Sequence, residues 1–149
     1  MIVLTDADVC EMQERTEEVS MSMDWKLELV PIPVSDVDRS KAFYAEQVGF
    51  DVDHDVNAYN DPKVSGKMRV VQLTPPGSAC SIAFGTGIVD TLPSSVQALH
   101  LLVSDIDAAR AELVERGVEV GEIQDLGGVL YASFSDPDGN GWVLQQLPY

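Results

Sequence analysis

Two histidines are the side chains of this chain best suited to proton transfer near neutral pH. An unperturbed imidazole titrates at about pH 6.5, so such a side chain can serve as a general acid or base. His100 lies in the apolar run ALHLLV, whereas His54 lies in the acidic run DVDHD. We take His100 as the candidate acid or base. The alternative is a neutral, hydrogen-bonded histidine at the edge of an apolar sheet.

The acidic run around His54 has an unfavourable spacing for a metal site. Successive side chains of a strand point to opposite faces, so Asp51, Asp53 and Asp55 would share one face. His54 would then lie on the other face, and no HxxxH or HExxH pattern occurs in the chain. The run therefore favours a solvated acidic strand over a metal-binding cluster.

The cysteines indicate neither a disulfide framework nor an activated nucleophile. Cys10 and Cys80 form no CxxC pair, which favours a reducing, cytoplasmic location. Cys80 and Ser81 follow each other in the run GSACSIAF, where the sequence fixes no base beside either side chain. Nucleophilic catalysis by these residues is therefore not expected.

The net charge of the chain restricts the classes of partner that it is expected to bind. Twenty-five acidic residues against nine Lys and Arg give a formal charge of −16. Nucleic acids and anionic membranes both require a basic surface, so neither is an expected partner. No apolar run approaches the roughly 20 residues of a membrane-spanning helix. The charge would attract a cationic ligand, although it also serves simply to keep a surface soluble.

The elements that must position these side chains form two copies of one pattern. VSDVDRSKAFYAEQVGFDVD (34–53) is echoed by VSDIDAARAELVERGVEVGE (103–122). In each copy a strand-like apolar run precedes a Ser-Asp pair that caps a helix, and a glycine ends that helix. A second strand follows, FDVDHDV or VEVGEI, and then a strand–turn–strand hairpin over 68–84 or 130–147. In the turn DPDGN, proline presets the first turn angle and Gly139 supplies a positive φ.

The first 24 residues stand outside this repeat. They are rich in acids, and they are expected to form an acidic helix or flexible arm without assigned chemistry. Residues 25–149 are expected to form the domain, with module one over 25–90 and module two over 96–149.

These modules, with VSD at each helix start and the terminal SDPDGNGW, resemble the vicinal oxygen chelate superfamily. That superfamily includes glyoxalase I, bleomycin-resistance proteins, fosfomycin-resistance transferases and extradiol dioxygenases. The resemblance implies an α+β fold of two βαβββ modules whose mixed sheet curls around a cleft, commonly in a homodimer. It also implies that the metal ligands of metal-dependent members come from the first and last strands of each module.

Those ligand places are vacated here. The resemblance puts them at Leu29, at Ala98, at Val143, and at the first-copy counterpart of Val143, which is Ser81 or Ala83. None of these side chains is a usual ligand of a divalent metal, so we expect no metal and no cofactor.

Strand alternation predicts the lining of the cleft. The expected lining residues are Leu29, Pro31, Pro33, Ser81, Ala83, Ala98, Leu102, Val143 and Gln145, with His100 among them. Tyr131 and Ser133 point inward or outward depending on a register that the sequence does not fix. An apolar lining with few polar groups suits binding of a small organic ligand, cationic or aromatic.

Two functions remain open from the sequence. The first is a small-molecule-binding protein whose cleft also catalyses a metal-independent isomerase or lyase reaction, with His100 as acid or base. The second is a drug-sequestering protein similar to the bleomycin-resistance proteins. A metal-dependent glyoxalase or dioxygenase is disfavoured by the vacated ligand places.

Overall fold

The computed structural model describes residues 23–57, 69–86 and 92–149. The predicted acidic segment 1–24 lies almost entirely outside these residues. The described elements are β1 (Leu29–Pro31), α1 (Val37–Ala42), η1 (Phe43–Val48), β2 (Asp51–Asn57), β3 (Arg69–Thr74), β4 (Ser81–Thr86), β5 (Leu99–Leu102), α2 (Ile106–Glu115), β6 (Gln124–Leu126), β7 (Val129–Ser135) and β8 (Gly141–Gln146). No described helix is long and apolar enough to cross a membrane.

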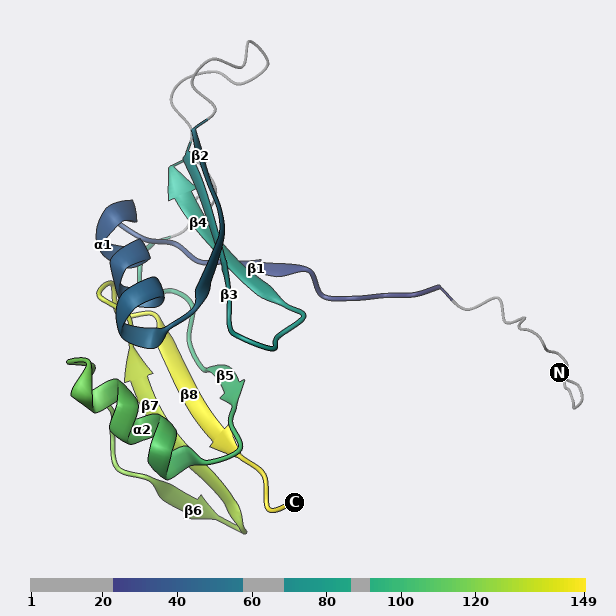
Figure 1. The fold of residues 1–149 in the computed structure, drawn as a ribbon, viewed down its shortest axis with the longest axis vertical. Coiled ribbons are helices and arrows are strands. Elements are labelled where there is room, and N and C mark those ends of the chain that lie inside the picture. Colours follow the sequence, from purple (N-terminus) through teal and green to yellow (C-terminus); the bar gives the residue numbers. More distant parts are fainter. Residues whose placement is uncertain (1–22, 58–68, 87–91) are drawn as a thin grey trace, which may run out of the picture.

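The strands form two four-stranded mixed sheets with the same topology. Their orders are β1-β4-β3-β2 and β5-β8-β7-β6, and the first strand of each runs parallel to its neighbour while the other pairs are antiparallel. The two sheets follow each other along the long axis of the molecule (Figure 1). The predicted α+β fold of two βαβββ modules is therefore confirmed.

The helix boundaries follow the predicted caps. The side chains of Asp36 and Asp105 each accept a hydrogen bond from a backbone N–H in the first turn, at 3.1 Å. Gly49 and Gly117 adopt positive φ angles of 94° and 88° after the helices end. Glycine tolerates this conformation because it lacks a Cβ.

The segment that contains the helix, from the preceding valine to the terminal glycine, is one residue longer in module one than in module two. Val34 and Val103 are 69 positions apart, whereas Gly49 and Gly117 are 68 apart. The structure accommodates this residue as the π-helical segment η1, which continues directly from α1. A single π-helical turn inside an α-helix has more residues per turn, so it can accommodate an extra residue.

The second strand of module two differs from the prediction. VEVGEI (118–123) is not a strand, and the pairing strand is instead β6, which begins at Gln124. Val118 and Val120 are buried in the core, and the Arg110 side chain donates hydrogen bonds to the carbonyls of Val120 and Gly121. The arginine thus satisfies carbonyls that a neighbouring strand would otherwise bond.

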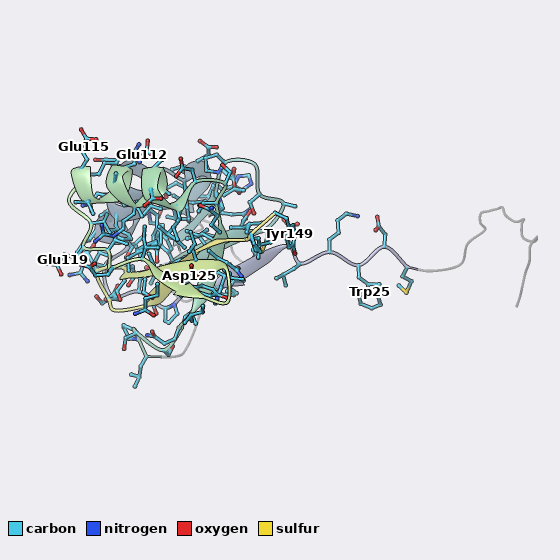
Figure 2. All side chains as sticks on the ribbon, turned by 90° about the horizontal axis from the view of Figure 1, so that it is seen from below. Trp25, Glu112, Glu115, Glu119, Asp125 and Tyr149 are labelled. Carbon is cyan, nitrogen blue, oxygen red and sulfur yellow. The ribbon has the colours of Figure 1, made fainter. Side chains whose placement is uncertain are left out.

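Both modules contribute to one hydrophobic core. It joins the helix-covered faces of the two sheets and includes Ile32, Phe43, Tyr44, Phe50, Phe84, Ile106, Leu113, Phe134, Trp142 and Leu144. Tyr44 lies at its centre, with ring centroids 5.8 Å from those of Phe84 and Trp142. By contrast, Trp25 is 82% exposed on an extended segment that leaves the body of the molecule (Figure 2).

Candidate functional site

The faces of the two sheets that point away from the helices form the candidate site. In module two, Ala132, Phe134, Trp142 and Leu144 are buried in the core. Alternate residues of the same strands must point to the other side. We call that side the open face of module two; its members are Ala98, His100, Leu102, Tyr131, Ser133, Val143 and Gln145.

The open face of module two brings together the predicted residues of that module. His100 pairs with Val143, and Leu102 pairs with Gln145, in the parallel register of β5 and β8. Leu102 is 66% exposed, and Ala98 and His100 are exposed as well. This face therefore combines apolar side chains with a few hydrogen-bonding groups, and it carries a single imidazole.

The surroundings of His100 are now defined. Its Nδ1 lies 2.7 Å from the carbonyl oxygen of Ala98, and its ring meets that of Tyr131 edge to face at 6.2 Å between centroids. A carbonyl is an acceptor, so Nδ1 carries the proton and Nε2 is left as the acceptor in the neutral ring. The pairing of Tyr131 with Gln145 fixes the register that the sequence left open, and Ser133, opposite Val143, is on the same face.

The open face of module one consists of Leu29, Pro31, Val70, Gln72, Thr74, Ser81 and Ala83 together with part of β2. Leu29 pairs with Ser81, and Pro31 pairs with Ala83. Because Pro31 and His100 hold the same place in the two first strands, Ala83 is the counterpart of Val143. The structure thus settles the alternative between Ser81 and Ala83.

Pro33 does not share that open face in the way that alternation predicts. It lies beyond the end of β1 and is buried, and its carbonyl accepts a hydrogen bond from Asn140 Nδ2 at 2.9 Å. The chain has left the sheet at this point to cross to the second module. The expected alternation applies only while the strand continues.

The predicted placement of His54 is wrong. The register of β2 against β3 shifts between Val52 and His54, so that His54 pairs with Gln72 and Asp55 with Val71. Val71 is buried in the core, and Asp55 forms an ion pair with Lys41 of α1 on that side. His54 therefore lies on the open face with Asp53, because the extra residue of the bulge reverses the alternation.

Hydrogen bonds hold Asp55 on the helix side. The hydrogen bonds that Arg69 and then Lys41 donate keep the pKa of the Asp55 carboxyl well below its usual range. The hydrogen bonds that Arg69 donates to Asp55 and Asp38 in turn raise the pKa of Arg69. Arg69 binds Asp55 through two nitrogens, each at 2.9 Å. This bidentate pair anchors β2 to β3 and leaves the neighbouring His54 on the opposite face.

The DPDGN turn of module two is anchored in module one. Tyr44 donates a hydrogen bond from its hydroxyl to Asp136 Oδ2 at 2.8 Å and accepts one from Trp142 Nε1 at 2.9 Å. Burial is the main reason why the pKa of Tyr44 is raised, and the nearby carboxylate of Asp136 raises it further. The protonated phenol is thus a fixed link that positions the start of β8 and, with it, Val143.

Cavities in a single chain cover only part of the open faces. One of about 720 Å³ wraps around the start of β8 and includes Ala98 and Val143, but also Phe43 and Gln47 from the helix side. A second of about 400 Å³ lies between the modules and includes Leu102. Neither encloses the open face of a module. The same residues would be enclosed only if a further surface covered them.

The donor set on these faces is poor in metal ligands. In the parts of the chain that the structure describes, no three His, Cys, Asp or Glu side chains come together in a group that could hold a metal ion. The places expected to bear ligands hold Leu29, Ala83, Ala98 and Val143, whose aliphatic side chains offer no lone pairs. The arrangement is suited to apolar contact and hydrogen bonding.

Paired βαβββ modules, each with one helix-covered face and one open face, define the class of this protein. A model of the Glyoxalase/Bleomycin resistance protein/Dioxygenase superfamily matches residues 26–144, and the chain belongs to that superfamily. No curated protein matches the chain.

Several solved structures are similar to this chain. TnmS3, an antibiotic binding protein from Streptomyces sp. CB03234, is 37% identical, with a TM-score of 0.68 over 85% of this chain and 98% of its own. A glyoxalase/bleomycin resistance protein from the same organism is also 37% identical, with a TM-score of 0.66 over 81% and 100%. A superfamily member from Sphaerobacter thermophilus DSM 20745 is 30% identical, with a TM-score of 0.69 over 84% and 99%.

Proposed function

We propose that this protein binds and sequesters a small apolar molecule, aromatic or cationic, without using a metal. The binding cleft would form in a homodimer, between the open face of module one in one copy and the open face of module two in the other. The ligand would contact the aliphatic residues of both faces, while His100 and Gln145 orient its polar groups.

The observation that carries this proposal is the apolar surface that Pro31 exposes in module one and that Ala98 and Leu102 expose in module two. The helix-covered faces of the two sheets share one core, so the open faces point outward (Figure 1). Pro31, Ala98 and Leu102 are exposed there, and β1 and β5 are edge strands of their sheets. Contiguous exposed apolar surface marks a binding or association site. The similarity to an antibiotic binding protein supports a ligand of this kind.

The acidic charge of the chain supports a cationic group on the ligand. The formal charge is −16, and acids are spread over the surface, as the labelled Glu112, Glu115, Glu119 and Asp125 illustrate (Figure 2). A negative surface raises the local concentration of cations and speeds their association. A cytoplasmic location belongs to the same proposal.

A second candidate function is a metal-independent lyase or isomerase. It is favoured by the exposed imidazole of His100, whose Nε2 is left as an acceptor by the contact of Nδ1 with the Ala98 carbonyl. In that case His100→Ala abolishes turnover. In the sequestering protein, the same change alters affinity by less than about tenfold, or roughly 1.4 kcal/mol.

The proposal is tested by fluorescence titration with 1-naphthylmethylammonium, an aromatic cation. We expect saturable binding that survives dialysis against EDTA, and a dimer in sedimentation analysis. Leu102→Asn should weaken binding at least about tenfold, because a neutral amide would lose its hydrogen bonds to water against the aromatic ring. Val114→Asn is the matched control, since Val114 is 49% exposed on α2, away from the open faces. Equal binding by both variants, or binding lost with EDTA, would contradict the proposal.

A further inference from the structure

A row of three hydrogen-bonded polar side chains crosses the open face of module one. Asp53 of β2, Thr74 of β3 and Ser81 of β4 are joined by hydrogen bonds, with Thr74 Oγ1 donating to Asp53 Oδ2 and lying 2.6 Å from Ser81 Oγ. We call these three residues the polar ladder. Asp53 is the unpaired residue of the bulge in β2, and its side chain reaches Thr74 from there.

The polar ladder has a fixed direction. A hydroxyl has one proton, and that of Thr74 is given to the Asp53 carboxylate, which can only accept. The second contact of Thr74 Oγ1 must therefore receive a proton from Ser81. Ser81 Oγ has then used its own proton and offers only lone pairs to its surroundings. Such chains strengthen each bond in turn, because each donor polarises the next.

The position of Ser81 suits contact with a ligand. It pairs with Leu29 and lies two residues before Ala83 in β4, so it borders the aliphatic part of the face. Ser81 is 6% exposed, so little water competes for the lone pairs of its hydroxyl. Module two has Gly141 at the corresponding place, so the ladder belongs to module one alone.

We propose that Ser81, held by the polar ladder, forms a subsite that accepts a hydrogen bond from an N–H or O–H group on the ligand. This inference rests on the proposed function and adds the chemistry that the ligand must present. An aromatic amine, ammonium or phenol fits the subsite. An ether or a ketone oxygen at the same place does not fit, because it would face lone pairs and leave an acceptor unpaired.

A matched pair of probes tests this subsite. The titrations compare 1-naphthol with 1-methoxynaphthalene, which share the ring system but differ in their ability to donate. For the wild-type dimer, we expect 1-naphthol to bind about five- to tenfold more tightly, the effect of one hydrogen bond. Ser81→Ala and Thr74→Val should each reduce that ratio to within about twofold. Val is close to Thr in shape, so the strand is retained.

A comparison of Asp53→Asn with the control Asp51→Asn separates the effect of hydrogen-bond direction in the polar ladder from the effect of negative charge on β2. Both changes remove one negative charge from β2, and Asp51 pairs with Thr74 across the sheet, but no hydrogen bond joins the Asp51 carboxylate to the ladder. An asparagine at position 53 can donate to Thr74, which allows Thr74 to donate to Ser81 and frees the Ser81 proton. We therefore expect Asp53→Asn to lower the ratio between the probes and Asp51→Asn to leave it unchanged.

The possible results distinguish the subsite from the cleft. If both probes bind the wild-type protein equally, or if Ser81→Ala keeps the preference for 1-naphthol, the subsite is overturned while the cleft stands. If Asp51→Asn lowers the ratio as much as Asp53→Asn, charge and not direction is responsible, which also overturns it. If neither probe binds saturably, the proposed cleft fails and the subsite fails with it.

Discussion

The hydroxyl of Tyr44 links the modules through two hydrogen bonds in a buried setting. Tyr44→Phe would leave Trp142 Nε1 without its partner and would remove one of the donors to Asp136. A buried polar group that loses its partner costs about 1–3 kcal/mol, so we expect the free energy of unfolding to fall by that amount. Urea denaturation measures it. Tyr149→Phe, at a residue 97% exposed, is the control and should change nothing.

Ser40 differs from Tyr44, because its buried hydroxyl makes no hydrogen bond with the described residues. Its Oγ is fully buried in α1 and has no hydrogen-bond partner among the described residues. The repeat places Ala109 at the matching position of α2. Ser40→Ala should therefore raise the free energy of unfolding by about 0.5–1 kcal/mol, from relieved desolvation and better helix propensity. Thermal denaturation reports the change, and a lowered midpoint would contradict this account.

At the scale of elements, the periodic features of the sequence were sufficient for most of the fold. Helix caps at Asp36 and Asp105, terminal glycines and two tight turns each act within a few residues, so their signals are local. The bulge at Asp53 has no local signal, because it depends on pairing with β3 and on the anchoring of Asp55 by Arg69 and Lys41.

The same reasoning explains which parts of the candidate site could be predicted. Alternation puts His100 and Leu102 on one face of β5, and the regular register of β5 against β8 keeps them there. It failed for His54, where a bulge intervenes, and for Pro33, where the strand has ended. The local sequence did not predict that β6 would be the pairing strand in place of VEVGEI. The reason is that Arg110, which belongs to α2, donates a hydrogen bond to a carbonyl of that segment. Long-range contacts decided each difference.

The DPDGN turn offers a test at the scale of one element. Gly139 has a φ of 88°, and an added Cβ would lie 3.1 Å from Ser94 Cβ. Gly139→Ala should thus lower the free energy of unfolding by at least about 1–2 kcal/mol, the cost of a left-handed conformation for an L-residue. Gly121→Ala is the control, because Gly121 lacks a positive φ and its nearest contact would be 3.6 Å away. Chemical denaturation of both variants makes the comparison, and equal effects would contradict the conformational argument.

At the scale of the whole molecule, the junction between the modules is reciprocal. Gln47, near the end of η1, donates from Nε2 to the carbonyl of Arg116 at 2.9 Å. Arg116, after α2, donates from Nη1 to the carbonyl of Gln47 at 3.3 Å. Each helix end therefore supplies a donor for the unpaired carbonyls of the other. Together with the shared core, these two hydrogen bonds make the folding of each module depend on the other.

A shared core predicts that the modules unfold together. Phe84 belongs to module one and Trp142 to module two, and both contact Tyr44 in the core. Phe84→Ala should cost about 3–5 kcal/mol, and it should lower the unfolding midpoint of module two as much as that of module one. In a Trp25→Phe background, Trp142 is the one remaining tryptophan, and it reports on β8 and on its contact with Tyr44 of module one. Its fluorescence and the far-ultraviolet circular dichroism of the whole chain should give coincident urea transitions, as in a two-state system.

Separate transitions, with that of Trp142 unmoved by Phe84→Ala, would mean that module two keeps its own core. In that case, the open faces of the two modules would be positioned independently of each other.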